Sequence, residues 1–212
     1  MFSPERVLVL APHTDDAELG CGGTMARWLD EGAEMFTAVF STAETSLPPG
    51  SPRYRLKDEC NDALDEIGVP EDHRFIYDYP VRELGYHRQD VLERMVKLAR
   101  EINPQVVLTP SGADLHQDHN VVYQESLRAF RHLTIMGYEL PWNHITFSTH
   151  AFVVLDENHL LRKWKALMRY DSQLELGRPY FRYEAIEAMA RVRGMQVKST
   201  FAEAYEMIRI RL

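Results

Sequence analysis

The chain has 212 residues, with 24 Lys and Arg against 32 Asp and Glu, and a formal net charge of −8. This length fits about one domain, and the 45% apolar and 26% charged residues are ordinary globular values. The acidic balance argues against a nucleic-acid binder or a protein of anionic membrane surfaces, since both need a basic face. Two cysteines, Cys21 and Cys60, are too few for a disulfide framework and form no zinc motif. With neither a signal peptide nor a long apolar run in view, we expect a soluble cytoplasmic protein.

Apolar patterns predict an alternation of strands and helices along the chain. In chain order these are strand 6–11, helix 24–31, strand 35–41, helix 53–67, strand 74–77, helix 90–102, strand 105–109, helix 121–133, strand 145–155, a helix around 160–168, helix 183–193 and strand 204–210. The alternation predicts an α/β fold with a mostly parallel sheet and helices on both faces. We expect one domain over residues 1–212, in which 136–144 leads into a C-terminal segment, about 140–212, that packs back on the core.

A first polar cluster follows the first predicted strand, in the stretch PHTDDAELGCGGT. It holds His13 and three carboxylates, those of Asp15, Asp16 and Glu18, and then glycines that allow tight turns and close packing. Ligands of open α/β sheets bind at the carboxyl ends of strands, so this loop is well placed for chemistry. His13 and Asp16 are suitable metal ligands, but a catalytic zinc usually takes three protein ligands.

A second polar cluster follows predicted strand 105–109 and contains His116, Asp118 and His119. If the two strands are neighbours, both loops converge on one edge of the sheet. Each cluster alone is more typical of a capped turn or a solvated loop. Together, at matching places in the topology, they favour a metal site, because a metal offsets the cost of burying carboxylates.

These motifs together resemble the PIG-L/LmbE-like deacetylase family. The first stretch is similar to the family's PHPDD-to-LGCGGT opening, and HQDH at 116–119 is similar to its HPDH-like motif. The stretch FAEAY at 201–205 resembles an AEAF-like end, and Ser172-Gln173 falls where such proteins often carry that pair. The resemblance implies a Rossmann-like fold, a zinc ion, and hydrolysis of an N-acylated amine, commonly an N-acetylated amino sugar.

The resemblance also implies a role for individual residues. It makes His13, Asp16 and His119 the zinc ligands, Asp15 the general base, and His116 a group that faces the reacting carbonyl. A zinc ion of this kind lowers the pKa of bound water toward about 7 and polarises a carbonyl. Whether Asp15 or His116 protonates the leaving amine stays open, and other divalent metals suit the same donors.

Four further residues qualify this assignment. Asp118 would orient His116 by accepting its second ring proton, or it is simply a solvated loop acid. Asp114 reads as a loop residue. Thr14 replaces the usual proline of the motif, which costs no ligand, and Ala17 replaces a common acidic residue, which leaves that carboxylate's role without a counterpart here.

The predicted function is a zinc-dependent N-deacetylase acting on an N-acetylated amino sugar such as N-acetylglucosamine, or on a sugar conjugate. Alternatives are a metal-dependent amidase on a non-sugar N-acyl or thiol-conjugate substrate, a metallophosphoesterase, and a non-catalytic metal-stabilised binding protein. Trp142 would line a sugar site or pack in a core or interface. In the long loop 42–55, Arg53 or Arg55 would hold a substrate group or form salt bridges. A homo-oligomer is possible.

Overall fold

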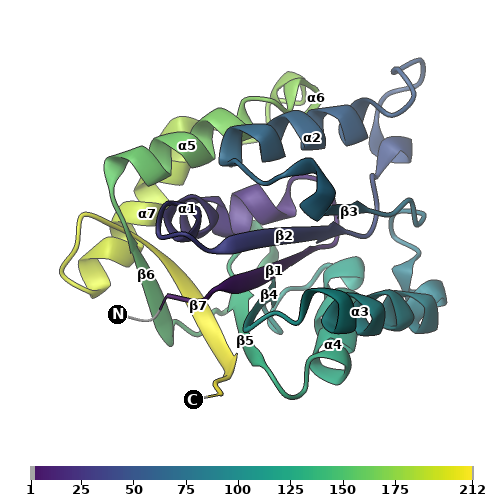
Figure 1. Cartoon of the computed structure of the whole chain (residues 1–212). Helices are drawn as coiled ribbons and strands as arrows, with labels where there is room; N and C mark the ends of the chain where they lie inside the picture. The colour runs from purple at the N-terminus through teal and green to yellow at the C-terminus, as the bar shows by residue number, and fades with distance from the viewer. Residues whose placement is uncertain (1–2, 212) are drawn as a thin grey trace.

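A computed structural model describes residues 3–211, which form a seven-stranded sheet in the order β3-β2-β1-β4-β5-β7-β6 (Figure 1). The strands are β1 (Arg6–Ala11), β2 (Glu34–Val39), β3 (Arg74–Ile76), β4 (Val106–Pro110), β5 (Thr134–Tyr138), β6 (Ala151–Leu155) and β7 (Phe201–Arg209). β7 runs antiparallel to both of its neighbours, and the remaining pairs are parallel. The mostly parallel α/β sheet predicted from the sequence is therefore confirmed.

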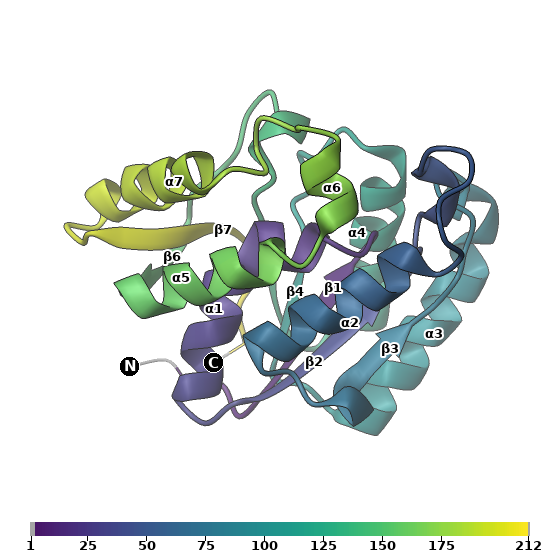
Figure 2. The same ribbon diagram turned by 90° about the horizontal axis from the view of Figure 1, so that it is seen from above.

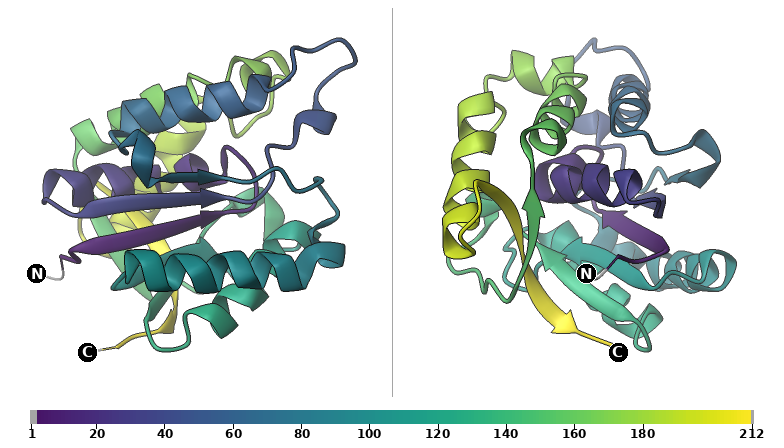
Figure 3. Two further views of the ribbon diagram at one scale, coloured as in Figure 1. Left: turned by 45° about the vertical axis from the view of Figure 1, so that its right-hand side comes forward. Right: turned by 60° about the vertical axis from the view of Figure 1, so that its left-hand side comes forward.

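Helices cover both faces of the sheet. The α-helices are α1 (Asp16–Asp30), α2 (Arg55–Ile67), α3 (Arg88–Ile102), α4 (Gln117–Ala129), α5 (Glu157–Leu167), α6 (Asp171–Glu175) and α7 (Tyr183–Gln196). The short 3₁₀ helices are η1 (Glu44–Ser46), η2 (Glu71–His73), η3 (Leu84–His87) and η4 (Pro141–Asn143). α1, α2 and α5 lie on one face and α3 and α4 on the other (Figures 1 and 3), while α7 packs along β7 (Figure 2). Within residues 3–211, no helix is long and apolar enough to cross a membrane.

The alternation of side chains along β1 produces two separate cores. Val7 and Val9 belong to the apolar cluster on the face of α1, and Leu8 and Leu10 belong to the cluster on the opposite face. Side chains of a strand point alternately to the two faces, so a strand covered on both sides is apolar at every position. This is why the continuous apolar run of β1 could be recognised from the sequence.

Helix α1 differs from its prediction because it begins at Asp16 rather than at residue 24. The helix is interrupted at Cys21, whose φ of −146° and ψ of 19° are not helical. A close approach explains the glycine just before this point, because a Cβ added to Gly20 would lie 2.3 Å from Cδ2 of Tyr138. The early start places Asp16 and Glu18 of the first polar cluster in the first turn of α1.

The stretch after α4 was predicted incorrectly. Residues 134–138 form β5 inside the sheet, between β4 and β7, whereas no strand was predicted there and 136–144 was expected to lead into the C-terminal segment. Correspondingly, α4 ends at Ala129 and begins at Gln117, four residues before the predicted start at 121. The predicted strand 145–155 is reduced to β6, and β6 and β7 extend the same sheet.

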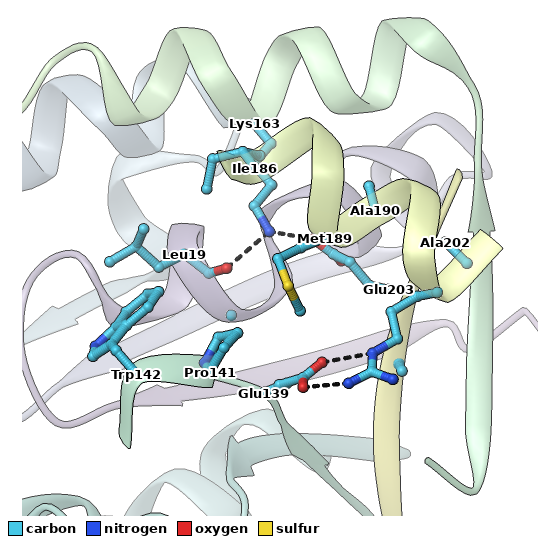
Figure 4. Close-up of a pocket in the computed structure, with 13 residues that line it drawn as sticks. Leu19, Glu139, Pro141, Trp142, Lys163, Ile186, Met189, Ala190, Ala202 and Glu203 are labelled. Atoms are coloured by element: carbon cyan, nitrogen blue, oxygen red, sulfur yellow. Dashed lines mark hydrogen bonds and ion pairs between the residues drawn. The ribbon is translucent and has the colours of Figure 1, made fainter. Parts of the chain in front are cut away.

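A buried ion pair from the C-terminal part of the chain holds both sides of the interruption in α1 (Figure 4). Nζ of Lys163 donates to the carbonyl oxygen of Leu19 at 2.8 Å and to Oε1 of Glu203 at 2.7 Å. The Glu203 carboxylate accepts the backbone N–H groups of Gly23 at 3.0 Å and Thr24 at 2.7 Å. An interrupted helix leaves such groups without helical partners. The pair therefore fixes where the first turn of α1 lies.

Candidate active site

The two polar clusters meet at one edge of the sheet. β1 and β4 are adjacent and parallel, with Val7 opposite Val106 and Val9 opposite Leu108. The loops that follow them therefore leave the same edge, as the sequence predicted. His13, Asp15 and Asp16 come from the first loop and the first turn of α1, and His116 and His119 come from the second loop and the first turn of α4.

Three donor atoms form a nearly equilateral triangle at this edge. Nδ1 of His13 lies 3.1 Å from Oδ2 of Asp16, which lies 3.2 Å from Nε2 of His119, and the two ring nitrogens are 3.2 Å apart. A tetrahedral zinc with bonds of about 2.0–2.1 Å holds its ligands roughly 3.4 Å apart. The three residues thus have the right donors, and nearly the right spacing, for one metal ion.

Another combination of three donors is also close together. The three histidines His13, His116 and His119 each offer a nitrogen, and these nitrogens lie within 4.8 Å of one another. The triangle that includes Asp16 is tighter, and it contains the neutral and anionic ligands that zinc commonly combines. We therefore favour Asp16 over His116 as the third donor.

Two buried carboxylates contact the far nitrogens of the donor histidines. Oδ2 of Asp114 lies 2.7 Å from Nδ1 of His119, and Oδ2 of Asp118 lies 3.0 Å from Nε2 of His13. Metal-binding histidines typically have a carboxylate at this position, which fixes the orientation and tautomer of the ring. Asp114 lies in the loop between β4 and α4, as expected, but it is more than a loop residue, since it is only 3% exposed and contacts His119.

The expectation that Asp118 orients His116 also does not hold, because the Asp118 carboxylate faces His13. It accepts the backbone N–H groups of Arg82 at 2.6 Å and Leu84 at 3.2 Å as well. The contact between Asp118 and His116 is different: the backbone N–H of Asp118 donates to Nδ1 of His116 at 3.2 Å, which caps α4. Asp118 therefore links the loop around residue 82 to a donor histidine.

The electrostatic potential at the donor triangle is strongly negative, because buried carboxylates surround the two histidines. Burial lowers the pKa of His13, but hydrogen bonds to Asp118 and Asp16 outweigh this and raise it to about 9. Burial also lowers the pKa of His119, but the charge of Asp16 and the hydrogen bond to Asp114 raise it to about 10. Burial raises the pKa of Asp16, yet the two histidines hold it well below its usual range. A field that favours ring protons also favours a divalent cation.

Asp15 and His116 stand next to the triangle without belonging to it. Asp15 is the residue before α1, but its side chain makes no capping hydrogen bond, so a purely structural role as a helix cap does not explain it. Burial, and then the charge of Asp16, raise the pKa of Asp15 to about 6. Burial, and then the two neighbouring histidines, lower the pKa of His116 to about 4.

A third carboxylate of the first cluster, Glu18, is fully buried. Burial raises its pKa to about 8. Its Oε2 lies 3.3 Å from the hydroxyl of Tyr170, and its Oε1 has no hydrogen-bond partner in the part of the chain that the structure describes. Unlike Asp15, it does not line the cleft beside the triangle.

That cleft has a volume of about 490 Å³. Asp15, His116 and the donor residues lie in it, and its walls come from distant parts of the chain. The wall residues include Ala43, Thr45, Ser46, Arg82, Trp142, Gln173, Arg178 and Tyr180. The loop 42–55 thus reaches the cleft, but Arg55 does not line it and instead pairs with Glu59 and Glu175.

Comparisons with known proteins show the family to which the chain belongs. The profile of the family described as PIG-L, GlcNAc-PI de-N-acetylase, matches residues 8–130. The uncharacterized deacetylase YaiS of Escherichia coli is 30% identical over 174 residues, which cover 78% of this chain and 90% of that protein. The chain belongs to the PIG-L family. Proteins similar to it include some that are named as deacetylases of N-acetylated sugars.

A second relative is the 1D-myo-inositol 2-acetamido-2-deoxy-alpha-D-glucopyranoside deacetylase of Kineococcus radiotolerans. It is 28% identical over 162 residues, which cover 59% of this chain but only 45% of that enzyme. The chain therefore aligns with about half of that longer relative.

Among solved structures, the conserved protein TT1542 of Thermus thermophilus has a TM-score of 0.81 and 26% identity, with 97% of this chain and 96% of that one covered. GalB, the 4-carboxy-2-hydroxymuconate hydratase of Pseudomonas putida, has a TM-score of 0.79 at 18% identity, with 98% of each chain covered. Because the second structure shares the fold and is named for a different reaction, the function must be argued from the site.

Proposed function

We propose that this chain is a zinc-dependent N-deacetylase that hydrolyses the acetyl amide of an N-acetylated amino sugar or sugar conjugate. The observation that carries the proposal is the triangle of His13 Nδ1, Asp16 Oδ2 and His119 Nε2, with Asp15 and His116 beside it in one cleft. The Kineococcus relative, which is named as a deacetylase of an inositol-linked N-acetylated sugar, supports the substrate class.

In this proposal the residues of the cleft have separate roles in hydrolysis. A zinc ion held by His13, Asp16 and His119 would polarise the amide carbonyl and make a bound water more acidic. Asp15 lies next to Asp16 in sequence but is not part of the triangle, so its carboxylate is free to take a proton from the attacking water.

His116 is suited to hydrogen-bond donation. Its Nδ1 accepts the backbone N–H of Asp118, so the neutral ring carries its proton on Nε2. In this role His116 stabilises the negative charge that develops on the amide oxygen, a type of contact worth about 3–4 kcal/mol. Asp114 and Asp118 act by positioning His119 and His13.

The aromatic wall of the cleft supports a sugar substrate. The rings of Trp142 and Tyr180 are stacked, with centroids 3.8 Å apart and planes inclined by 11°. Trp142 is 39% exposed and lines the cleft, so part of its ring is available to a substrate. Aromatic faces provide rigid apolar contact area for such a group.

The experiment measures bound metal and released acetate on the same protein. We expect about one zinc per chain, and acetate release from N-acetylglucosamine or its conjugates that stops on chelation and returns with zinc. His119→Ala should lose both, whereas His132→Ala, on the exposed surface away from the cleft, should keep both. Acetate released from non-sugar amides alone would favour the amidase alternative, and metal without hydrolysis of any amide would refute the proposal.

A further inference from the structure

Two arginines, Arg82 and Arg178, line the cleft, and Arg178 is the half-buried one. Arg178 lies in the loop between α6 and α7, and its Nη1 donates to the hydroxyl of Tyr180 at 2.7 Å. Its Nε is buried and has no hydrogen-bond partner among the described residues. Within residues 3–211, no carboxylate forms an ion pair with this guanidinium, although the cleft is rich in carboxylates. Because Nε is enclosed, a ligand in the cleft would contact the outer guanidinium nitrogens of Arg178, which lines the cleft, and an anionic oxygen forms strong charge-assisted hydrogen bonds with such nitrogens.

Two other half-buried arginines, Arg55 and Arg193, do form ion pairs with carboxylates. Nη1 and Nη2 of Arg55 each donate to one oxygen of Glu175, at 3.0 and 2.8 Å. Arg193 makes a similar two-pronged contact with Glu139 (Figure 4). The planar guanidinium suits carboxylate or phosphate oxygens in this two-pronged manner. Arg178 has the same guanidinium, but no carboxylate of residues 3–211 pairs with it.

The surroundings of Arg178 suit a ring that carries an anionic group. Its Cζ lies 5.8 Å from the centroid of the Tyr180 ring, and Tyr180 stacks on Trp142. Arg178 is also close enough to Asp15 for its charge to lower the pKa of that carboxyl, against the stronger effect of burial. A second basic residue, Arg82, lines the same cleft and is exposed.

Building on the proposed deacetylase function, we propose that Arg178 binds a carboxylate or phosphate on the substrate, whose ring or chain packs on Trp142. The substrate class is then an anionic N-acylated amine. The net charge of −8 does not contradict this, because charges farther away than roughly 8–10 Å are screened by salt, whereas Arg178 would touch the anion.

The first test compares three compounds with the zinc-loaded full chain: N-acetylglucosamine, N-acetylglucosamine 6-phosphate and N-acetylmuramic acid. The first is neutral, the second carries a phosphate, and the third carries a carboxylate close to the amide. We expect kcat/KM for at least one anionic compound to exceed that for the neutral one by about 10- to 100-fold. Which anion is preferred identifies the phosphate or the carboxylate as the group that is bound.

Variants assign the preference to Arg178. Arg178→Gln should reduce the ratio of kcat/KM for the anionic compound to that for the neutral compound to near one. Arg178→Lys should keep part of this ratio, because the positive charge remains although the planar guanidinium is lost. Arg100→Gln, an exposed arginine on α3 outside the cleft, is the matched control and should keep the full ratio. Equal ratios in the wild type and Arg178→Gln would overturn the proposal.

A binding measurement separates this proposal from the catalytic one. Dissociation constants for the same three compounds are measured with Asp15→Asn protein, in which turnover is blocked, by calorimetry. Tighter anion binding that Arg178→Gln abolishes supports the anion site, even if no acetate is released by the wild type, in which case only the deacetylase proposal fails. Acetate release without any difference in affinity between neutral and anionic compounds leaves the deacetylase in place and refutes the anion site.

Discussion

The buried pair Lys163–Glu203 should make a large contribution to stability, and Glu203→Gln tests it. Both side chains are almost fully buried, and Glu203 accepts from Lys163, Gly23 and Thr24. Glutamine has nearly the same shape, but it is neutral and has only one acceptor oxygen. In the variant the Lys163 ammonium no longer faces a negative charge and keeps its hydrogen bond to the carbonyl oxygen of Leu19. Because one side-chain oxygen is lost, a backbone N–H of α1 is left without an acceptor.

Removing one partner of a buried ion pair costs about 3–5 kcal/mol. In a chain of this size, 1 kcal/mol corresponds to a change in Tm of about 2–4 °C, so we expect Tm to fall by about 6–20 °C. The free energy of unfolding is measured by equilibrium denaturation in urea, with the metal content of all proteins held equal. Glu187→Gln, which breaks an exposed pair with Arg191 on α7, is the matched control and should cost less than about 1 kcal/mol.

The double variant Lys163→Met/Glu203→Gln separates the ion pair from packing. Since it no longer contains a lone buried charge, it should be more stable than the sum of the two single changes by at least about 1 kcal/mol. The reasoning is refuted if Glu203→Gln loses less than about 1 kcal/mol, or if the two single effects simply add.

Three predictions concern the site. Asp15→Asn should keep its metal and lose at least about a hundredfold in kcat, because the proton acceptor is removed and the donors remain; normal turnover would exclude Asp15 as the base. In a metal titration, His119→Ala should weaken zinc binding far more than His116→Ala, and the reverse order would exchange their roles. Asp114→Asn should weaken zinc binding by about 10- to 100-fold, as is typical for a carboxylate behind a metal-binding histidine, and unchanged affinity would restore its interpretation as a loop residue.

The sequence predicted the parts of the fold and site that depend on local pattern. β1 and β4 are continuous apolar runs, and the loops after them meet because the strands are neighbours. β5 escaped detection because the short stretch 134–138 follows a helix without a clear break and contains Gly137. That glycine is a tertiary requirement, since an added Cβ would lie 2.9 Å from Cα of Ser111.

The site residues that the sequence did not reveal, Asp114, Arg178 and Tyr180, also depend on tertiary contacts. Asp114 acts on His119 only because the loop turns back on itself, with the backbone N–H of Asp114 donating to the carbonyl of Ser111 at 3.1 Å. Arg178 and Tyr180 lie far along the chain from the polar clusters, and no periodicity connects them. The isolated Arg178 offers no sequence signal of its own. Glu203 lies in the stretch 201–205 that resembles the family's end, but that resemblance did not indicate what the residue contacts.

The chemistry and the walls of the site come from different parts of the chain. The match to the PIG-L family covers residues 8–130, which contain the donor triangle, Asp15 and His116. Trp142, Arg178 and Tyr180, which form one wall of the cleft, all lie beyond it. The later part also stabilises the earlier one, since Lys163 and Glu203 hold the interruption of α1 and hence the turn that carries Asp16. Substitutions of the wall residues Trp142, Arg178 or Tyr180 should therefore alter which substrate is bound, whereas substitutions of Lys163 or Glu203 should alter metal binding and stability together.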